Sequence, residues 1–386
     1  MKIAVNGEHL TDPHFSTGLR RYVENLLSHL AVIDRKNTYY IFCPSTSVEF
    51  TETNFHLMPV PLKKRTNYAD VIVRSREYGR LGCDLLFLPH IEYPKGVDLS
   101  MVLPVVHDLI PTLFLTPRFL LRGKTSVKLL TTKGVVNYIH LKRHAKKFKR
   151  IIAVSQTTKQ TVGAFLGRRW EERITVIHAG VDPGFNRHSG QIDKKVVSDY
   201  GLFPGRYLIY FGGLAVRKNL GRTVRAYRRL PIDLRQEYPF VIVGEGYWKE
   251  WIIKKGFTEH LRFVSTVSDH ALAKLVSGAA LSIYPSLLEG FGLPILESIG
   301  AGTLPLVSRI PSSLEITGPD FPTFDPYSVS DIQARLLEYL SSREKRENTL
   351  EKYRGLPLDY SWSSCASELV DVFHQLFRKQ RSMSSF

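Results

Sequence analysis

Short apolar runs alternate with longer amphipathic segments along almost all of this 386-residue chain. Such alternation is typical of parallel β-sheets whose strands are joined by crossover helices. The apolar runs lie near residues 2–6, 38–43, 84–88, 102–106, 150–155, 174–178, 207–212, 240–244, 261–265, 280–285 and 304–308. We therefore predict an α/β protein with two doubly wound, Rossmann-like parallel sheets.

Two domains are expected because the chain exceeds the usual size of one hydrophobic core. A polar stretch punctuated by glycine and proline, from Gly180 to Gly205, predicts the joint. We predict domains at 1–185 and 200–361, with a helix at 362–378 crossing back onto the first. Ligands bind beyond the carboxyl ends of parallel strands, so we expect the active site in a cleft between the facing sheets. Closure of that cleft would exclude water.

Composition narrows the class of protein. A hydrophobic fraction of 43% is ordinary for a globular protein, and no apolar run is long enough to span a membrane. The opening apolar run is too short for a secretory signal. The three cysteines, Cys43, Cys83 and Cys365, are widely scattered, which argues against a disulfide framework and against metal-ligand spacing. We therefore expect a reducing, cytoplasmic location.

The formal charge of +17 is concentrated, since no Asp or Glu occurs between Leu109 and Trp170. Basic and apolar residues interleave there at helical spacing, which suits peripheral contact with an anionic membrane surface. A solvated basic helix explains the same pattern, and both interpretations stay open. Nucleic acid is the least favoured partner, because the chain has no zinc-finger spacing, RNP-like strand or basic-zipper heptads.

A tight glycine loop between two carboxylates, Glu289 and Glu297, runs straight into a predicted helix. Gly290 and Gly292 allow the main chain to approach a ligand, and Pro294 suits the first helical position. The helix N-terminus favours phosphate. Glu289 is expected before the helix and Glu297 in its first turn, where both could accept hydrogen bonds from sugar or ribose hydroxyls. The alternative is an ordinary loop with a capping acid.

Two cations, Arg217 and Lys218, follow a strand and the glycine pair Gly212 and Gly213. They can balance a diphosphate, although a solvated pair at a helix start is the alternative. Gly244 ends another strand, where a nucleotide base or ribose is possible. Because the dinucleotide fingerprint is incomplete there, hydride transfer is doubtful.

His107 stands at a strand end and is followed by Asp108. Adjacent strand residues point to opposite faces, so the two do not form a direct relay, but a strand ending at Val106 could aim His107 into the cleft. A structural histidine is the alternative. Near the amino terminus Thr17 is a plausible helix N-cap and Gly18 permits close approach of a ligand, while an ordinary cap is the alternative.

No metal and no cofactor are indicated, since the chain has no Asp-x-Asp triplet and no zincin spacing. Cationic side chains and backbone N–H groups would then stabilise a departing diphosphate.

Taken together, these motifs resemble those of family 4 glycosyltransferases, which are retaining enzymes of the GT-B fold. The resemblance rests on Glu-x7-Glu with Gly-Phe-Gly between, Arg-Lys-Asn at 217–219, His-Asp-Leu-Ile-Pro at 107–111 and Gly-Val-Asp at 180–182. It implies that Glu297 binds the donor ribose and Glu289 the transferred sugar. It also implies that the N–H groups of Phe291, Gly292 and Leu293 meet the sugar and phosphates and that Arg217 and Lys218 bind the diphosphate. By the same resemblance, His107 meets a sugar hydroxyl and Gly18 lines the donor-acceptor junction. Ser265 and Ala179 depart from the family pattern, which often has Gly and Asn there.

The resemblance further implies front-side transfer of a hexose from a nucleotide-diphosphate sugar, which is a substrate and not a cofactor. The turn at 107–111 together with 217–219 looks like enzymes that use GDP-mannose, so mannose is favoured and a UDP-hexose is the main alternative. A lipid-linked or polysaccharide acceptor is expected in the first half. A nucleotide-sugar epimerase and a nucleic-acid-binding module are the other classes that stay open.

Overall fold

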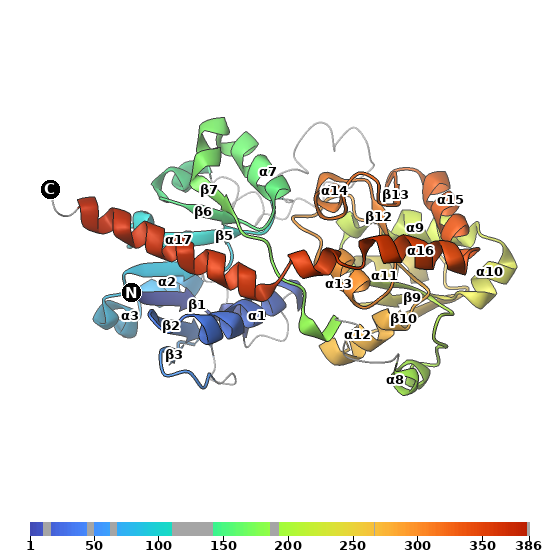
Figure 1. Cartoon of the computed structure of the whole chain (residues 1–386), viewed down its shortest axis with the longest axis horizontal. Helices are drawn as coiled ribbons and strands as arrows, with labels where there is room; N and C mark the ends of the chain where they lie inside the picture. The colour runs from blue at the N-terminus through green and yellow to red at the C-terminus, as the bar shows by residue number, and fades with distance from the viewer. Residues whose placement is uncertain are drawn as a thin grey trace. The chain divides into compact units, whose positions relative to one another are not determined.

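The fold was analysed in a computed structural model that describes residues 1–10, 17–44, 50–61, 68–109, 142–185, 193–265 and 267–383. The chain divides into two compact units, shown along the colour ramp in Figure 1. The N-terminal unit comprises Met1–Gly180 and Trp362–Phe386, and the C-terminal unit comprises Val181–Ser361. The boundary falls at the start of the punctuated stretch that begins with Gly180. Each unit is described by itself below.

The N-terminal unit contains a parallel sheet with the strand order β3-β2-β1-β4-β5-β6-β7. Its strands are β1 (Lys2–Asn6), β2 (Thr38–Cys43), β3 (Phe55–Pro59), β4 (Leu85–Leu88), β5 (Val102–Val106), β6 (Ile151–Ala153) and β7 (Ile174–Val176). Strands β4, β5 and β6 are buried along their whole length, as expected for a parallel sheet covered on both faces. This burial explains why they read as continuous apolar runs in the sequence.

The described helices of this unit include α1 (Thr17–Ile33), α2 (Tyr68–Val73), α3 (Arg76–Leu81), α7 (Gln156–Leu166) and α17 (Trp362–Met383). Short 3-10 helices are η1 (Glu8–Leu10), η2 (Leu99–Met101), η4 (Ala145–Lys147) and η5 (Arg168–Arg173). Helix α1 buries Val23, Leu26 and Leu30 completely, which is the apolar stripe that its 3.6-residue period predicts. Helix α17, red in Figure 1, returns to this unit and packs against α1, with Trp362 edge-on to Tyr22.

The C-terminal unit contains a second parallel sheet with the order β10-β9-β8-β11-β12-β13. Its strands are β8 (Leu208–Phe211), β9 (Phe240–Val243), β10 (Leu261–Val264), β11 (Leu281–Tyr284), β12 (Pro305–Ser308) and β13 (Thr323–Phe324). All four residues of β8, β9, β11 and β12 are buried, so the centre of this sheet forms the core of the unit.

The described helices of this unit are α8 (Lys194–Asp199), α9 (Leu220–Arg228), α10 (Ile232–Glu237), α11 (Tyr247–Lys254), α12 (Asp269–Ser277), α13 (Leu293–Gly300), α14 (Pro311–Thr317), α15 (Val329–Leu340) and α16 (Arg343–Tyr353). The 3-10 helices are η6 (Pro183–Phe185), η8 (Val216–Lys218) and η9 (Leu356–Asp359). Helix α9 shows the amphipathic register expected from the sequence, since Leu220, Val224 and Tyr227 are fully buried while Arg225 and Arg228 are exposed.

The predicted α/β class with two doubly wound parallel sheets is confirmed, with strand ends shifted by one or two residues. Two strands, β3 and β13, were not predicted from the sequence. Strand β3 reads Phe-His-Leu-Met-Pro, which lacks a clean apolar run, and β13 is only two residues long. The predicted N-cap at Thr17 is wrong, because α1 already includes Thr17.

Most of the acid-free basic stretch, residues 110–141, lies outside the described residues, and so do the predicted positions Ile110 and Pro111. Within the ranges that the structure describes, no helix has both the length and the apolar character needed to cross a bilayer.

Both sheets reverse their strand order next to the first strand of the unit. In the N-terminal unit the reversal lies between β1 and β4, and in the C-terminal unit between β8 and β11. Loops leaving neighbouring strands at such a point diverge to opposite faces, which opens a crevice where ligands bind in open α/β sheets. The polar residues that follow these four strands are therefore the first candidates for a functional site.

Candidate active site

At the switch point of the C-terminal unit, one carboxylate is held by two cations. Glu289 follows β11, and its Oε1 lies 2.6 Å from Lys218 Nζ while its Oε2 lies 2.6 Å from Arg217 Nη1. The Glu289 and Lys218 side chains are each only 9% exposed, whereas Arg217 is 26% exposed. The adjacent Arg217 and Lys218 are thus brought to Glu289, which lies 71 positions after Lys218, by the pairing of β8 with β11.

The backbone around the two cations is fixed by buried hydrogen bonds. Arg217 and Lys218 lie in η8, and Leu287 N donates to Arg217 O at 2.8 Å, which joins this turn to the loop after β11. Asn219 follows in the left-handed conformation with φ 57°. Its Nδ2 donates to Pro285 O at 3.1 Å and to Pro326 O at 2.7 Å. Asn219 therefore closes η8, starts α9 and holds both against the loop that carries Glu289.

The charges in this cluster explain its protonation. Burial by itself would raise the pKa of Glu289, but Lys218 and Arg217 outweigh it and lower the pKa to about 2. Lys218 Nζ also donates to Tyr284 Oη at 3.3 Å and lies 5.0 Å from the centre of that ring. Burial, followed by the charge of Glu289, raises the pKa of Tyr284. At neutral pH the cluster therefore holds an ionised carboxylate, two cations and a neutral phenol.

Two glycine turns at the ends of β8 and β9 touch each other. Gly212 has φ 126° and Gly244 has φ 127°, both in the region that favours glycine. A Cβ added at Gly244 would lie 2.4 Å from Gly212 O, so no larger residue fits there without backbone movement. At Gly213 an added Cβ would meet nothing within 4 Å, and Gly213 O accepts a hydrogen bond from Tyr210 Oη at 2.8 Å. Packing explains Gly244, whereas Gly213 is open to a ligand.

The loop after Glu289 enters α13 through Gly292, which has φ 142° and serves as N-cap without a side-chain hydrogen bond. Pro294 is the second residue of α13, one position later than predicted. Phe291 is 7% exposed and its ring packs 5.5 Å from that of Tyr360. Gly290 and Leu293 are the remaining predicted residues of this segment. Ile316 packs against Gly292 from the core side, since its Cδ1 would lie 3.0 Å from a Cβ added at Gly292. The main chain of the loop is thus fixed at a helix N-terminus, where anions are favoured.

The second carboxylate differs from the prediction in position. Glu297 lies beyond the first turn of α13, since that helix begins at Leu293 and has no acidic residue in its first turn. Glu297 is 2% exposed. The early start of the helix at Leu293 accounts for the difference. That Glu297 meets a ribose stays a prediction.

In the N-terminal unit, β5 ends at Val106, so His107 is the first residue of the turn. His107 Nε2 donates to Pro89 O at 2.7 Å, and Tyr22 lies edge-on to its ring at 4.6 Å. Burial lowers the pKa of His107 to about 4, with His90 adding to the effect against the Pro89 hydrogen bond. His107 is therefore neutral at pH 7. Because its Nε2–H donates to Pro89, its Nδ1 carries a lone pair that can accept a hydrogen bond from a hydroxyl.

The lowered pKa of His107 predicts a loss of stability in acid. In the unfolded chain His107 binds a proton below pH 6.5, whereas in the folded protein it does so only near pH 4. The free energy of unfolding therefore falls as the pH decreases from 6.5 to 4. For this histidine alone we expect a loss of about 1–2 kcal/mol between pH 7 and 5. Urea midpoints at the two pH values measure it. His107→Gln should show a smaller loss, and equal losses in both proteins would contradict the assignment.

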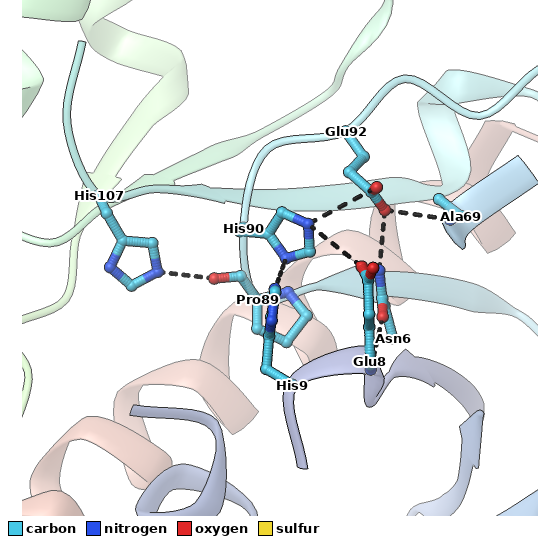
Figure 2. Close-up of polar contacts among 8 residues, drawn as sticks. All are labelled: Asn6, Glu8, His9, Ala69, Pro89, His90, Glu92 and His107. Carbon is cyan, nitrogen blue, oxygen red and sulfur yellow. Dashed lines mark hydrogen bonds and ion pairs between the residues drawn. The ribbon is translucent and has the colours of Figure 1, made fainter. Parts of the chain in front are cut away.

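Five polar residues meet at the switch point of the N-terminal unit (Figure 2). Asn6 ends β1, Glu8 and His9 lie in η1, and His90 and Glu92 follow β4. His9 Nε2 lies 3.1 Å from His90 Nδ1, while His90 Nε2 lies 3.6 Å from Glu92 Oε1 and 3.9 Å from Glu8 Oε2. Sequence reasoning missed this group because residues 8–9 and 90–92 are far apart. The available signal was that polar residues directly follow two strands.

The histidines of this group have opposite pKa shifts. Burial, together with His90 and His107, lowers the pKa of His9 to about 3. Burial would also lower the pKa of His90, but Glu92 and Glu8 outweigh it and raise the pKa. The remaining predicted residue of this unit, Gly18, is exposed in α1, and a Cβ there would meet nothing within 4 Å. The protein itself therefore does not require glycine at this position.

Two family models match the chain, one in each half. The model described as Glycosyltransferase Family 4 matches residues 16–185, and the model described as Glycosyl transferases group 1 matches residues 203–355. The chain belongs to the family 4 glycosyltransferases. The group 1 match contains the Glu289 cluster and the loop into α13, and the Family 4 match contains His107.

Several curated relatives of this family 4 glycosyltransferase are named as mannosyltransferases. The O-antigen chain mannosyltransferase B of Escherichia coli is 31% identical over 47% of this chain and 49% of its own length. The serotype-specific mannosyltransferase WbdA of Escherichia coli is 27% identical over 61% of this chain and 30% of its own length. The GDP-mannose:cellobiosyl-diphosphopolyprenol alpha-mannosyltransferase of Xanthomonas oryzae is 26% identical over 43% of this chain and 42% of its own length. The matches thus span about half or less of these relatives.

Among solved structures, WaaG, a glycosyltransferase involved in lipopolysaccharide biosynthesis, superposes with a TM-score of 0.73. It is 19% identical and the match covers 96% of this chain and 99% of WaaG. At that identity the likeness concerns the fold, and it confirms the predicted GT-B architecture of this family 4 glycosyltransferase.

Proposed function

We propose that this protein is a retaining glycosyltransferase that moves a hexose, with mannose favoured, from a nucleotide-diphosphate sugar to a glycan or lipid-linked acceptor. The observation that carries the proposal is the Glu289 cluster. Two cations and an ionised carboxylate gather at 2.6 Å separations beside a helix N-terminus, at the switch point of the C-terminal sheet. This combination offers positive charge for a diphosphate and an acceptor for sugar hydroxyls at one place.

In this proposal each group has a distinct part in holding the donor. Arg217 and Lys218 bind the diphosphate. Their positive charge, which Glu289 now neutralises, would then be shared between Glu289 and the diphosphate. Glu289, with its pKa of about 2, is ionised at any physiological pH and accepts hydrogen bonds from the transferred sugar. Glu297 binds the ribose hydroxyls. The N–H groups of Phe291, Gly292 and Leu293 meet the sugar and phosphates. Gly213 leaves room for the nucleotide, and Gly212 and Gly244 form the packed turns beside it.

The proposed reaction keeps the anomeric configuration by a front-side path. The bond from the anomeric carbon to the donor phosphate oxygen breaks, and the acceptor oxygen bonds to that carbon on the same face. The acceptor proton passes to the departing phosphate oxygen. Arg217 and Lys218 stabilise the negative charge that develops there, so no metal is needed at the diphosphate. Neutral His107 accepts a hydrogen bond from a sugar hydroxyl through Nδ1.

Mannose carried by GDP is the favoured donor because of two independent similarities. The segments 107–111 and 217–219 look like those of GDP-mannose enzymes, and the relatives compared above are named as mannosyltransferases, one of them with GDP-mannose in its name. A UDP-hexose remains the competing donor.

A thermal-shift panel of GDP-mannose, UDP-glucose, GDP and UDP tests the proposed function. A ligand that binds only the folded state raises the melting temperature, and at equal concentration the ligand with the lower Kd raises it more. We expect GDP-mannose to give the largest rise. Stabilisation by UDP-glucose alone would change the donor and keep the glycosyltransferase, whereas no response to any of the four compounds would overturn the proposal.

Replacement of Lys218 by alanine should lower turnover by at least about tenfold, because one of the two cations at the departing phosphate is lost. The same change leaves Glu289 with a single cationic partner, so its pKa should rise from about 2. Initial rates at saturating donor measure the effect. Lys345→Ala is the matched control, since Lys345 pairs with Glu338 at the surface. Unchanged turnover in folded Lys218→Ala protein would remove Lys218 from the site.

We further propose that the basic stretch from Leu109 to Trp170 brings the protein to an anionic membrane that holds a lipid-linked acceptor. The support is the absence of Asp and Glu in that span and the apolar residues interleaved with its cations. Binding to vesicles containing phosphatidylserine should weaken steeply between low salt and 0.5 M NaCl. Equal binding to neutral and anionic vesicles would contradict it.

A further inference from the structure

We propose that Glu8, His9 and His90 form a binding site for a divalent transition metal, of the Zn²⁺ type, in the N-terminal unit. Its three residues lie in the N-terminal unit, whereas Arg217, Lys218 and Glu289 of the proposed donor site lie in the other unit. Two imidazoles and one carboxylate are the donor set of many open zinc sites, in which a water or substrate oxygen takes the fourth position.

The spacing of the donors fits a shared ion. His9 Nε2 and His90 Nδ1 face each other at 3.1 Å, as Figure 2 shows. Two nitrogens that bind one tetrahedral Zn²⁺ at about 2.0–2.1 Å lie about 3.3 Å apart, so the spacing fits. Both rings must turn until their lone pairs point to the ion and no longer to each other. One ligand atom from each of Glu8, His9 and His90 lies within 4.8 Å of the other two. A nitrogen-rich set of this kind favours Zn²⁺, Co²⁺, Ni²⁺ or Cu²⁺ over Mg²⁺ or Ca²⁺.

The second nitrogen of His90 meets a carboxylate, which is the arrangement that orients metal-bound histidines. His90 Nε2 lies 3.6 Å from Glu92 Oε1. Glu92 is held in turn, because its Oε2 accepts from Asn6 Nδ2 at 2.8 Å and from Ala69 N at 3.1 Å. His90 Nε2 also lies 3.9 Å from Glu8 Oε2, while Nδ1 is the nitrogen of His90 that faces His9. Binding of one ion through Nδ1 therefore requires the Glu8 carboxylate to turn from Nε2 towards the His9–His90 pair. Glu92 is therefore a positioning residue.

The backbone also holds Glu8 and His9 in place. Glu8 N donates to Asn6 Oδ1 at 2.9 Å, and Gly7 N donates to Phe42 O at 2.7 Å. A Cβ at Gly7 would lie 2.8 Å from Ile41 Cγ2, so glycine is required for the chain to turn so closely after β1. Glu8 is 7% exposed and His9 is 1% exposed. Buried carboxylate and imidazole groups lose solvation, and a cation among them offsets that loss.

The competing explanation is a hydrogen bond between the two imidazoles without a metal. It requires a proton on one of the facing nitrogens, whereas the metal requires lone pairs on both. The two explanations therefore differ in whether the protein takes up an ion, and the wild-type protein alone can decide between them.

The test uses the full chain without an affinity tag, treated with a chelator and then dialysed against Zn²⁺ or Co²⁺. We expect about one metal ion per chain by mass spectrometry, and with Co²⁺ an intense visible absorption from a four- or five-coordinate ion. Absence of bound metal, or Co²⁺ with only the weak absorption of the hydrated ion, would overturn the proposal.

Variants locate the ion. His90→Gln, His9→Gln and Glu8→Gln should each weaken Zn²⁺ binding at least tenfold, and Glu92→Gln should weaken it about tenfold while leaving one ion per chain. His56→Gln is the matched control, because His56 lies exposed in β3 of the same unit. Wild-type affinity in folded His90→Gln would place the ion elsewhere. Should His90→Gln fail to fold, Glu8→Gln carries the same comparison, and unchanged affinity in that variant would contradict the site.

Discussion

Glu289→Gln is expected to lower turnover by at least about tenfold, which corresponds to about 1.4 kcal/mol of transition-state stabilisation. The substitution keeps the shape of the side chain and removes its charge. The amide has one acceptor oxygen where the carboxylate has two, so it accepts fewer hydrogen bonds from the sugar. It also no longer orients Arg217 and Lys218, each of which lies 2.6 Å from a carboxylate oxygen in the wild type. Initial rates of product formation at saturating donor give the effect on turnover.

A second measurement separates this role from a loss of structure. Without the carboxylate, the two cations have more positive charge to offer a diphosphate, so binding of GDP or UDP should be retained or become tighter. Glu259→Gln is the matched control, since Glu259 pairs with Arg235 at the surface and is 60% exposed. Full activity in folded Glu289→Gln, or equal losses in both variants, would refute the assignment.

Asn219→Ala is expected to destabilise the protein by about 2–4 kcal/mol. The variant loses two buried hydrogen bonds, to Pro285 O and Pro326 O, and each lost bond costs about 1 kcal/mol or more when its carbonyl is left without a donor. Alanine is also strained at φ 57°, which adds about 1 kcal/mol. The urea midpoint at neutral pH measures the sum.

Asn219→Gly divides this loss into its two parts. Glycine adopts positive φ without strain but has no amide to donate, so Asn219→Gly should be more stable than Asn219→Ala by about 1 kcal/mol while remaining less stable than the wild type. If glycine proved no better than alanine, the left-handed backbone would not contribute. If both variants matched the wild type, the two carbonyls would have other donors.

The sheets were largely predictable because parallel strands buried on both faces leave continuous apolar runs. Strands such as β8, β9 and β11 have that character, and the sequence located each to within a residue or two. Strand β3 has one buried residue, Phe55, among half-buried and exposed ones, so its periodicity is weak. The short β13 has no period at all. Burial on both faces is therefore what made a strand visible in the sequence.

The sequence predicted which residues belong to the candidate site better than it predicted how they contact one another. Motif spacing selected Arg217, Lys218 and Glu289 but assigned the cations to a diphosphate and the carboxylate to a sugar. Their direct pairing depends on β8 lying next to β11, which no local pattern encodes. The Glu8, His9 and His90 group was missed for the same reason, because it requires β1 to lie next to β4.

Helix α17 gives the N-terminal unit a discontinuous chain. Phe373 of this helix is fully buried and packs against Phe87 of β4 and Tyr39 of β2, so the core of the unit includes a side chain that is synthesised after the whole C-terminal unit. During synthesis the whole C-terminal unit, Val181–Ser361, is made before α17 and can fold first. The segment Met1–Gly180 cannot complete its core until α17 has been made. A premature stop codon shortly before residue 362 would therefore damage the N-terminal unit, although it lies after most of that unit in the sequence.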